Sequence, residues 1–396
     1  MSAPIQVAGR TYYPHVEGLR GVAALYVFVF HIWQTAIQHP ATGTLTAWLA
    51  ATPFLQYGHF AVAAFIVISG YCLALPVAQR GPGSFDAKQF FVRRAWRLMP
   101  AYVPVVLLSV IPFCAVALLT GTRINLPHIG IAVALHLALI HNLFFATTEY
   151  LNGPLWSIAL ECQIYVVFAL LLIPVWRRFG IAAQLAVALV LGFVPHFAFQ
   201  HVSRAFDWTV PWLLGLFAMG VVAAAICARP ALPRLPWNAL TALAAVVAVI
   251  AIVPFRDGVT LDFWLWPGDL ALGATLALFF VAAHRNARIL PARLLSARPV
   301  VFLGTFSYSL YLIHAPLVDL VGVLLKRAHA GPLESVLVWL LVVLAVVALA
   351  YGFYRLFERP FMTPSFRRAM QRRLRKNNSA DPAPETVSEL VAQPAS

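Results

Sequence analysis

The sequence predicts an all-α polytopic membrane protein, with about ten transmembrane helices and one further segment that re-enters the membrane without crossing it. Hydrophobic residues make up 61% of the 396 residues and charged residues only 11%. Soluble domains, in contrast, are roughly 45–50% apolar and about 25% charged. The mean hydropathy of +0.82 arises from apolar segments long enough to cross a bilayer, separated by short polar stretches.

The distribution of Lys and Arg indicates which apolar segments cross. If segment 129–146 does not cross, 23 of the 28 Lys and Arg residues lie on the side of both termini and 5 on the other. If it crosses, the counts become 11 and 17. The first division is stronger, so we expect ten spans, with both termini cytoplasmic. The apolar segments are 18–37, 58–79, 98–119, 129–146, 155–174, 181–199, 209–228, 237–254, 268–284, 300–325 and 333–356.

The chain divides into a membrane domain, residues 1–361, and a tail, residues 362–396. The tail begins with basic residues, which we expect to lie on anionic lipid, and continues with polar sequence that we expect to be disordered. The net charge of +14 flanks the apolar segments, so it reflects membrane topology and not a nucleic-acid partner. The four cysteines show no metal-ligand spacing, so we expect free thiols and no bound metal.

The first apolar segment carries two ionisable residues, Arg20 at its start and His31 well inside it. An ionisable residue at membrane depth is costly, and it therefore indicates a functional site with a partner nearby. Eleven residues of helix rise roughly 16 Å, which places His31 near or beyond mid-membrane. Since an imidazole can act as a general base near neutral pH, we expect His31 to be catalytic together with Arg20.

A basic cluster follows the second span, with Arg93, Arg94 and Arg97 in a predicted cytoplasmic loop. Arg93 and Arg97 are four residues apart and would share a helical face. Guanidinium groups in such a cluster suit bidentate recognition of a phosphorylated ligand. The alternative is a topology anchor, since cytoplasmic loops carry cations in any case.

The fifth apolar segment, 155–174, carries a carboxylate, Glu161, about 9 Å from its start. A carboxylate at that depth needs a cationic or hydrogen-bonding partner, and His31 is the natural candidate. We therefore expect Glu161 to be catalytic. A purely structural pair between helices is the competing interpretation.

The tenth apolar segment, 300–325, carries three polar-tipped residues at a spacing of three, Tyr308, Tyr311 and His314, which places them along one helical face. Such a face indicates a lined cavity. The last span ends in Glu358, followed by Arg359 and Pro360, to which we assign no role. The residues expected to bind substrate are Tyr308, Tyr311, His314, Ser69, Tyr71 and Trp156.

In their order along the chain, these stretches resemble the motifs of the acyltransferase-3 family of bacterial membrane acyltransferases. Small departures are Ile158, where Leu is usual, and Gln163-Ile164 before Tyr165, where Phe is common. The matching stretches are Arg20 to His31 (R-x10-H), Arg93 to Pro100 (RRxxRxxP), Trp156 to Tyr165 (WSL-x-x-E-x-x-Y) and Ser307 to His314 (SY-x-x-YL-x-H).

The resemblance implies an O-acetyltransferase of a bacterial inner membrane that moves an acyl group, usually acetyl, from acyl-CoA to a hydroxyl. The expected acceptor is a cell-envelope carbohydrate or lipid-linked saccharide, and the form is stand-alone, without a C-terminal esterase-like domain. Acyl-CoA would then be a co-substrate, with no tightly bound cofactor. Its phosphates would meet Arg93, Arg94 and Arg97, while His31 deprotonates the acceptor, either directly or through an acyl-histidine intermediate.

Two alternatives stay open at this point. One keeps the reaction but changes the acceptor to a small metabolite such as a macrolide. The other is a transporter or flippase for a glycolipid, in which intramembrane His and Glu residues form a proton relay.

The topology is testable with a reporter fused near Glu149. Because the stronger charge division leaves segment 129–146 on one side of the membrane, the reporter should read as periplasmic. A fusion after Arg80, expected to be cytoplasmic, is the control. A cytoplasmic signal at Glu149 would show that the segment crosses.

Overall fold

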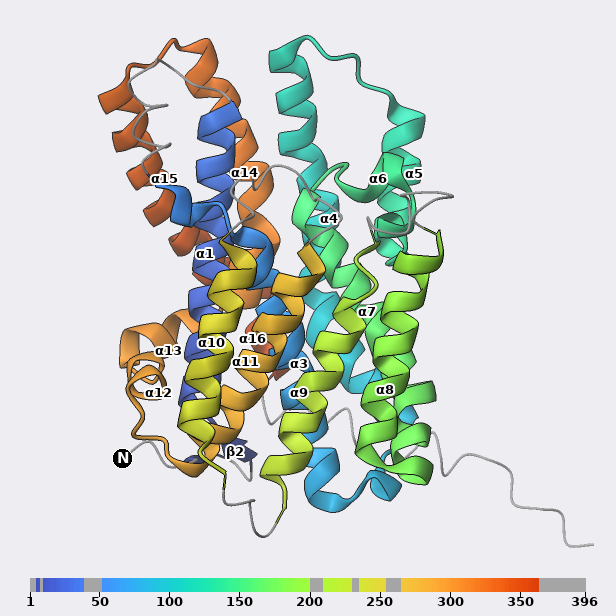
Figure 1. Cartoon of the computed structure of the whole chain (residues 1–396). Coiled ribbons are helices and arrows are strands. Elements are labelled where there is room, and N and C mark those ends of the chain that lie inside the picture. Colours follow the sequence, from blue (N-terminus) through green and yellow to red (C-terminus); the bar gives the residue numbers. More distant parts are fainter. Residues whose placement is uncertain are drawn as a thin grey trace, which may run out of the picture.

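The structure, a computed structural model, is a bundle of long helices with one short hairpin near the N-terminus (Figure 1). It describes residues 5–7, 10–38, 52–199, 209–229, 235–253 and 265–362. The tail from residue 363 onward, whose basic and disordered parts were predicted above, lies outside the described residues. The all-α polytopic class predicted from the sequence is confirmed.

The hairpin pairs β1 (Ile5–Val7) with β2 (Arg10–Tyr12). The long helices are α1 (Pro14–Gln38), α3 (Gly58–Arg80), α4 (Ala87–Thr120), α7 (Trp156–Val167), α8 (Ile173–Phe199), α9 (Leu213–Cys227), α10 (Trp237–Ile252), α11 (Leu265–Arg285), α14 (Ser307–Arg327) and α15 (Pro332–Phe353). Shorter helices are α5 (Leu126–Leu137), α6 (Phe145–Thr148), α12 (Leu290–Leu295), α13 (Arg298–Thr305) and α16 (Arg359–Met362). The π-helical turns η5 (Phe168–Leu172) and η7 (Tyr354–Glu358) join α7 to α8 and α15 to α16, and 3₁₀ turns lie at Pro53–Leu55, Pro82–Ser84, His141–Leu143 and Gly153–Leu155.

Seven helical runs within the described residues are long and apolar enough to cross a membrane. One of them, Gly153–Ala198, is broken at Gly180, whose φ of 87° and ψ of 174° reverse the chain between two passes. Dividing that run and adding the shorter apolar helices α9 and α10 gives the ten segments that the sequence predicts. Helix α5 has 12 residues and rises about 18 Å, too little for a hydrocarbon core of about 30 Å.

The structure corrects two boundaries. The basic cluster around Arg94 is not a loop, because α4 begins at Ala87 and continues as one helix through Pro100. The apolar segment 300–325 is not one helix, since Phe306 has a φ of −122° and separates α13 from α14. The second break lets α14 begin at Ser307, directly at the site described below.

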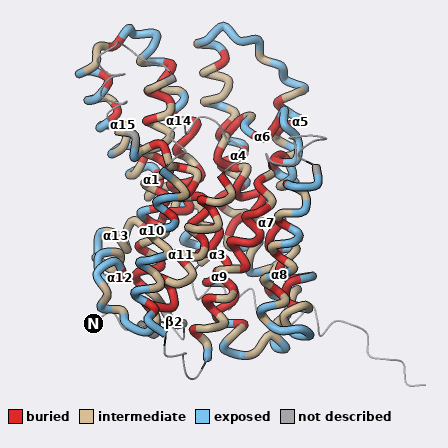
Figure 2. Tube along the Cα trace, viewed as in Figure 1, coloured by how far each residue is buried: buried red, intermediate tan, exposed pale blue. Residues whose placement is uncertain are grey.

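Buried residues concentrate in the middle of the bundle, around α3, α7, α9 and α11, while the outer faces are exposed (Figure 2). The exposed faces of α10 and α15 are apolar, for example Ile250 at 67% and Leu344 at 69% exposure. Large apolar side chains on such faces are what a lipid environment favours.

Glycines set the closest helix contacts. Gly70 on α3 lies against the backbone of Phe217 on α9, and Gly220 on α9 lies against the backbone of Val67 on α3. Small residues allow helix backbones to approach closely in membrane proteins, where packing replaces the hydrophobic effect. Gly304 on α13 makes the same kind of contact with α1, against the backbone of Glu17. This contact fixes the start of α1 beside the start of α14.

Replacing Gly70 by Ala should lower stability by about 1–3 kcal/mol, because the added Cβ would overlap the carbonyl oxygen of Phe217. Gly352→Ala on α15 is the matched control, since nothing lies within 4 Å of its added Cβ, and it should be neutral or stabilising by up to about 1 kcal/mol. Thermal unfolding of the purified proteins in detergent measures both. Equal unfolding temperatures would contradict the proposed α3–α9 contact.

Candidate active site

A cavity of about 110 Å³ lies among α1, α3, α4, α7 and α14. Helix α3 contributes mainly apolar lining, and the other helices contribute most of the polar groups. The four motif stretches, far apart in the sequence, therefore meet at one place. The predicted site residues that line the cavity are Arg20, Ser69, Arg94, Arg97, Glu161, Tyr308 and Tyr311.

Three guanidinium groups face this cavity, those of Arg20, Arg94 and Arg97. Arg94 and Arg97 are three residues apart on α4, so they share the face that packs inward. Arg93 does not belong to this set. It is exposed and donates a hydrogen bond to Gln89 Oε1 at 2.9 Å, one turn earlier on the same helix. Of the three arginines expected to bind the phosphorylated ligand, Arg94 and Arg97 therefore line the cavity and Arg93 does not.

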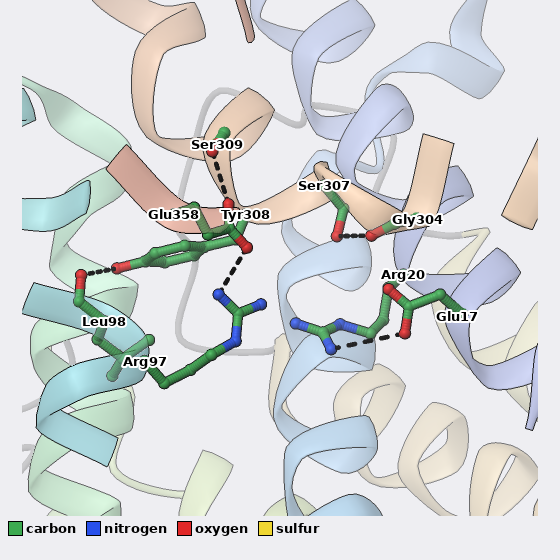
Figure 3. Close-up of polar contacts among 9 residues, drawn as sticks. All are labelled: Glu17, Arg20, Arg97, Leu98, Gly304, Ser307, Tyr308, Ser309 and Glu358. Atoms are coloured by element: carbon green, nitrogen blue, oxygen red, sulfur yellow. Dashed lines mark hydrogen bonds and ion pairs between the residues drawn. The ribbon is translucent and has the colours of Figure 1, made fainter. Parts of the chain in front are cut away.

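The arginines differ in how they are held (Figure 3). Arg97 donates to Glu358 Oε1 at 2.6 Å, and Ser309 donates to Glu358 Oε2, also at 2.6 Å. Arg20 is 3.9 Å from Glu17, and both side chains are partly exposed. Arg94 has a buried Nε with no hydrogen-bond partner among the described residues. A buried, unsatisfied guanidinium nitrogen beside a cavity favours an anionic ligand there.

The sequence led us to expect that Glu161 pairs with His31, but the structure gives it another partner. It accepts a hydrogen bond of 2.6 Å from Tyr165, four residues later on α7, and the Tyr165 hydroxyl also lies 3.2 Å from Ser69 Oγ. The partner is local because residues four apart on a helix face each other. The hydrogen bonds of Glu161, Tyr165 and Ser69 therefore lie at the wall of the same cavity that the arginines line.

His31 instead pairs with His314. Its Nδ1 is 2.8 Å from the carbonyl oxygen of Val27, one turn earlier on α1. Since a carbonyl oxygen can only accept, Nδ1 carries the proton and donates to it. His314 Nδ1 is likewise 2.8 Å from the carbonyl of Tyr311, which leaves its Nε2 as an acceptor, 3.2 Å from Nδ1 of His31. In this arrangement the lone pair of His31 is on Nε2. A base with a fixed tautomer and an orienting partner is the arrangement that proton abstraction requires.

Tyr311 joins the two parts of the site. Its hydroxyl is 2.7 Å from Ser157 Oγ, and the carbonyl oxygen of Pro154 lies 3.0 Å from the Tyr311 hydroxyl and 3.1 Å from Ser157 Oγ, so that one hydroxyl donates to the other and the second donates to the carbonyl. Its ring lines the cavity and lies 5.7 Å from the ring of His314. Ser157, the serine of the Trp156 to Tyr165 stretch to which the sequence analysis gave no role, has only 4% exposure. The histidine pair is thus adjacent to the cavity without being part of its lining.

Two predicted residues lie elsewhere. Tyr71 points away from the cavity and stacks on Phe280 at 4.6 Å between ring centroids. Trp156 is half-buried and packs against the hydrophobic core instead of lining the cavity. Cys72, next to Tyr71 in the sequence, lines the cavity and is exposed. Within the described ranges, no group of three or more His, Cys, Asp or Glu side chains could hold a metal ion.

The fold and the site define a class: an integral membrane protein with an internal cavity that combines several guanidinium groups with an adjacent histidine pair. Within that class the chain belongs to the acyltransferase-3 family, whose profile, described as an acyltransferase domain, matches residues 13–355. The family predicted from the four motif stretches is therefore confirmed.

Curated relatives agree with this assignment. The chain is 26% identical over 386 residues to the O-acetyltransferase OatA of Staphylococcus aureus strain NCTC 8325, and equally to that of strain COL. Each match covers 90% of this chain and 58% of the relative, so the chain spans little more than half the length of these proteins. No solved structure matches the chain.

Proposed function

We propose that the protein is a membrane O-acyltransferase. It moves an acetyl group from acetyl-CoA to a hydroxyl of a cell-envelope carbohydrate or lipid-linked saccharide, in a bacterial inner membrane with both termini cytoplasmic. The observation that carries the proposal is the cavity with three arginines, adjacent to a histidine pair that lies farther along α1 and α14. Membership of the acyltransferase-3 family and the relatives named O-acetyltransferase support the type of reaction.

The donor end of the site is the cavity. Arg20, Arg94 and Arg97 meet the phosphates of acetyl-CoA, because guanidinium groups bind phosphate oxygens through two parallel hydrogen bonds. With the start of α1 on the cytoplasmic side, the cavity is on the side where acyl-CoA is made. A cell-envelope acceptor then approaches from the far side.

The dimensions of the donor fit the spacing along α1. The arm of CoA from its phosphate to its sulfur has about 13 bonds, and an extended chain covers at most about 3.6 Å for every three bonds, hence about 15 Å. From Arg20 to His31 the helix rises roughly 16 Å. A donor whose phosphate lies at Arg20 therefore places its thioester at the level of His31.

At that level, His31 Nε2 takes the proton from the acceptor hydroxyl. The new C–O bond forms as the C–S bond breaks, and the proton passes from His31 to the sulfur of CoA. The imidazolium that forms in between is stabilised because its Nδ1–H is shared by two acceptors, the carbonyl oxygen of Val27 at 2.8 Å and Nε2 of His314 at 3.2 Å. The charge appears in a site of low dielectric, where such a fixed acceptor contributes more than water would.

His31→Ala should abolish acetyl-CoA-dependent release of CoA in membranes that contain the protein and host envelope glycan. A general base contributes about 10²- to 10⁴-fold in rate. His314→Ala should lower kcat less, with KM for acetyl-CoA nearly unchanged, because His314 acts through His31. Labelled acetyl groups should appear on glycan. Transport of a glycolipid without CoA release would favour the flippase instead, and release unaffected by His31→Ala would overturn the role of His31.

Arg94→Ala should raise KM for acetyl-CoA about 10- to 100-fold, since a hydrogen bond to a charged group contributes roughly 1.5–3 kcal/mol. Arg93→Ala is the matched control, because Arg93 is next to Arg94 on α4 but is exposed and lies outside the cavity. It should change KM by less than about threefold. Equal effects of the two substitutions would mean that the basic cluster acts only through its overall charge.

A further inference from the structure

Glu358 lies in the π-helical turn η7, at the end of the last long helix, and the proposed reaction gives it no role so far. Its side chain has 0% exposure, which is rare for a carboxylate unless it is paired. Removing a carboxylate from water costs several kcal/mol, so it persists in the interior only with good partners. The partners are Arg97 and Ser309, each at 2.6 Å and each on a different oxygen.

The bridge holds Arg97 from several sides (Figure 3). One nitrogen, Nη1, is bound to Glu358, and the guanidinium carbon lies 5.3 Å from the centre of the Tyr308 ring. Tyr308 is itself fixed, because its hydroxyl donates to the carbonyl of Leu98 at 3.3 Å. The guanidinium has further N–H donors besides the one that faces Glu358, and Arg97 lines the cavity.

The other two arginines make no such bridge with any residue that the structure describes. The closest carboxylate contact of Arg20 is the 3.9 Å one to Glu17, and Nε of Arg94 is buried without a partner among the described residues. An arginine side chain has about 2 kcal/mol of rotamer entropy to lose when it binds a ligand. In Arg97 much of that freedom is already removed by Glu358, before any donor arrives.

We infer that Glu358 is a positioning residue of the donor site, which acts on the donor through Arg97. It fixes the guanidinium so that the remaining N–H groups present one arrangement to a phosphate group, and Ser309 fixes Glu358 in turn. This inference rests on the proposed function, because it assumes a phosphorylated donor in the cavity. A bridge that only fastened the last helix to α4 would lower stability when it is broken, but it would not raise KM for acetyl-CoA selectively over kcat.

The test measures KM for acetyl-CoA and kcat of CoA release for Glu358→Ala, Arg97→Ala and the double variant. Glu358→Ala should raise KM about tenfold, with kcat changed less than about threefold. Glu358→Gln, which keeps an oxygen for Arg97, should recover most of the loss. In the Arg97→Ala background, Glu358→Ala should cause no further rise in KM, because its action passes through Arg97.

A milder variant covers the case in which Glu358→Ala does not fold, as judged by thermal unfolding in detergent. Ser309→Ala removes the bond to the second carboxylate oxygen and should raise KM about threefold, an effect that disappears in the Arg97→Ala background. A rise in KM that persists undiminished without Arg97 overturns the inference, as does an unchanged KM in Glu358→Ala. If the wild-type protein releases no CoA from acetyl-CoA, the proposed function fails, and this inference fails with it.

Discussion

Every charged group within this bundle must find its partner in the protein or in a bound ligand, because lipid offers none. The architecture follows from that constraint. The polar residues of α1, α4, α7 and α14 turn toward one another and surround a cavity, while the faces left for lipid are apolar. The same constraint acts away from the site. Asp269, with 0% exposure, accepts a hydrogen bond from Trp212 at 2.7 Å and lies 2.9 Å from His59 Nε2. These two contacts connect the beginnings of α3, α9 and α11.

The site depends on close helix contacts as much as on its polar groups. Gly304 lets α13 approach the backbone of α1 at Glu17, one turn before Arg20. The chain then breaks at Phe306, and α14 starts with Ser307, whose hydroxyl donates to the carbonyl of Gly304 at 2.9 Å. In this way one small residue brings α1 and α14 together, and the pairing of His31 with His314 follows about three turns beyond Arg20 on α1 and about two turns beyond Ser307 on α14.

Much of this could be predicted from the sequence, because the demands of lipid act on composition and length. Apolar segments and the positions of Lys and Arg predicted the helical class, and ionisable residues inside spans pointed to Arg20, His31 and Glu161. The rotation of each helix about its axis could not be predicted in the same way, since packing decides it. For this reason Arg93 was expected to bind the donor together with Arg94 and Arg97, although it is exposed and lies outside the cavity. The Glu161–Tyr165 pair could have been predicted, because the two residues are four apart on one helix. The His31–His314 pair was not, since its members are 283 residues apart and only tertiary packing brings them together.

The distance between the arginines and the histidine pair has an electrostatic consequence. Two like charges 4 Å apart interact by about 4 kcal/mol at an effective dielectric constant of 20, but by only about 1 kcal/mol at 16 Å. Guanidinium groups next to His31 would therefore oppose the imidazolium that forms when it accepts a proton. A helix rise of roughly 16 Å from Arg20 to His31 largely removes that penalty, and the buried Glu358 lowers the net charge of the cluster further. A long flexible donor, with its phosphates at one end and its reactive thioester at the other, allows one molecule to use both environments.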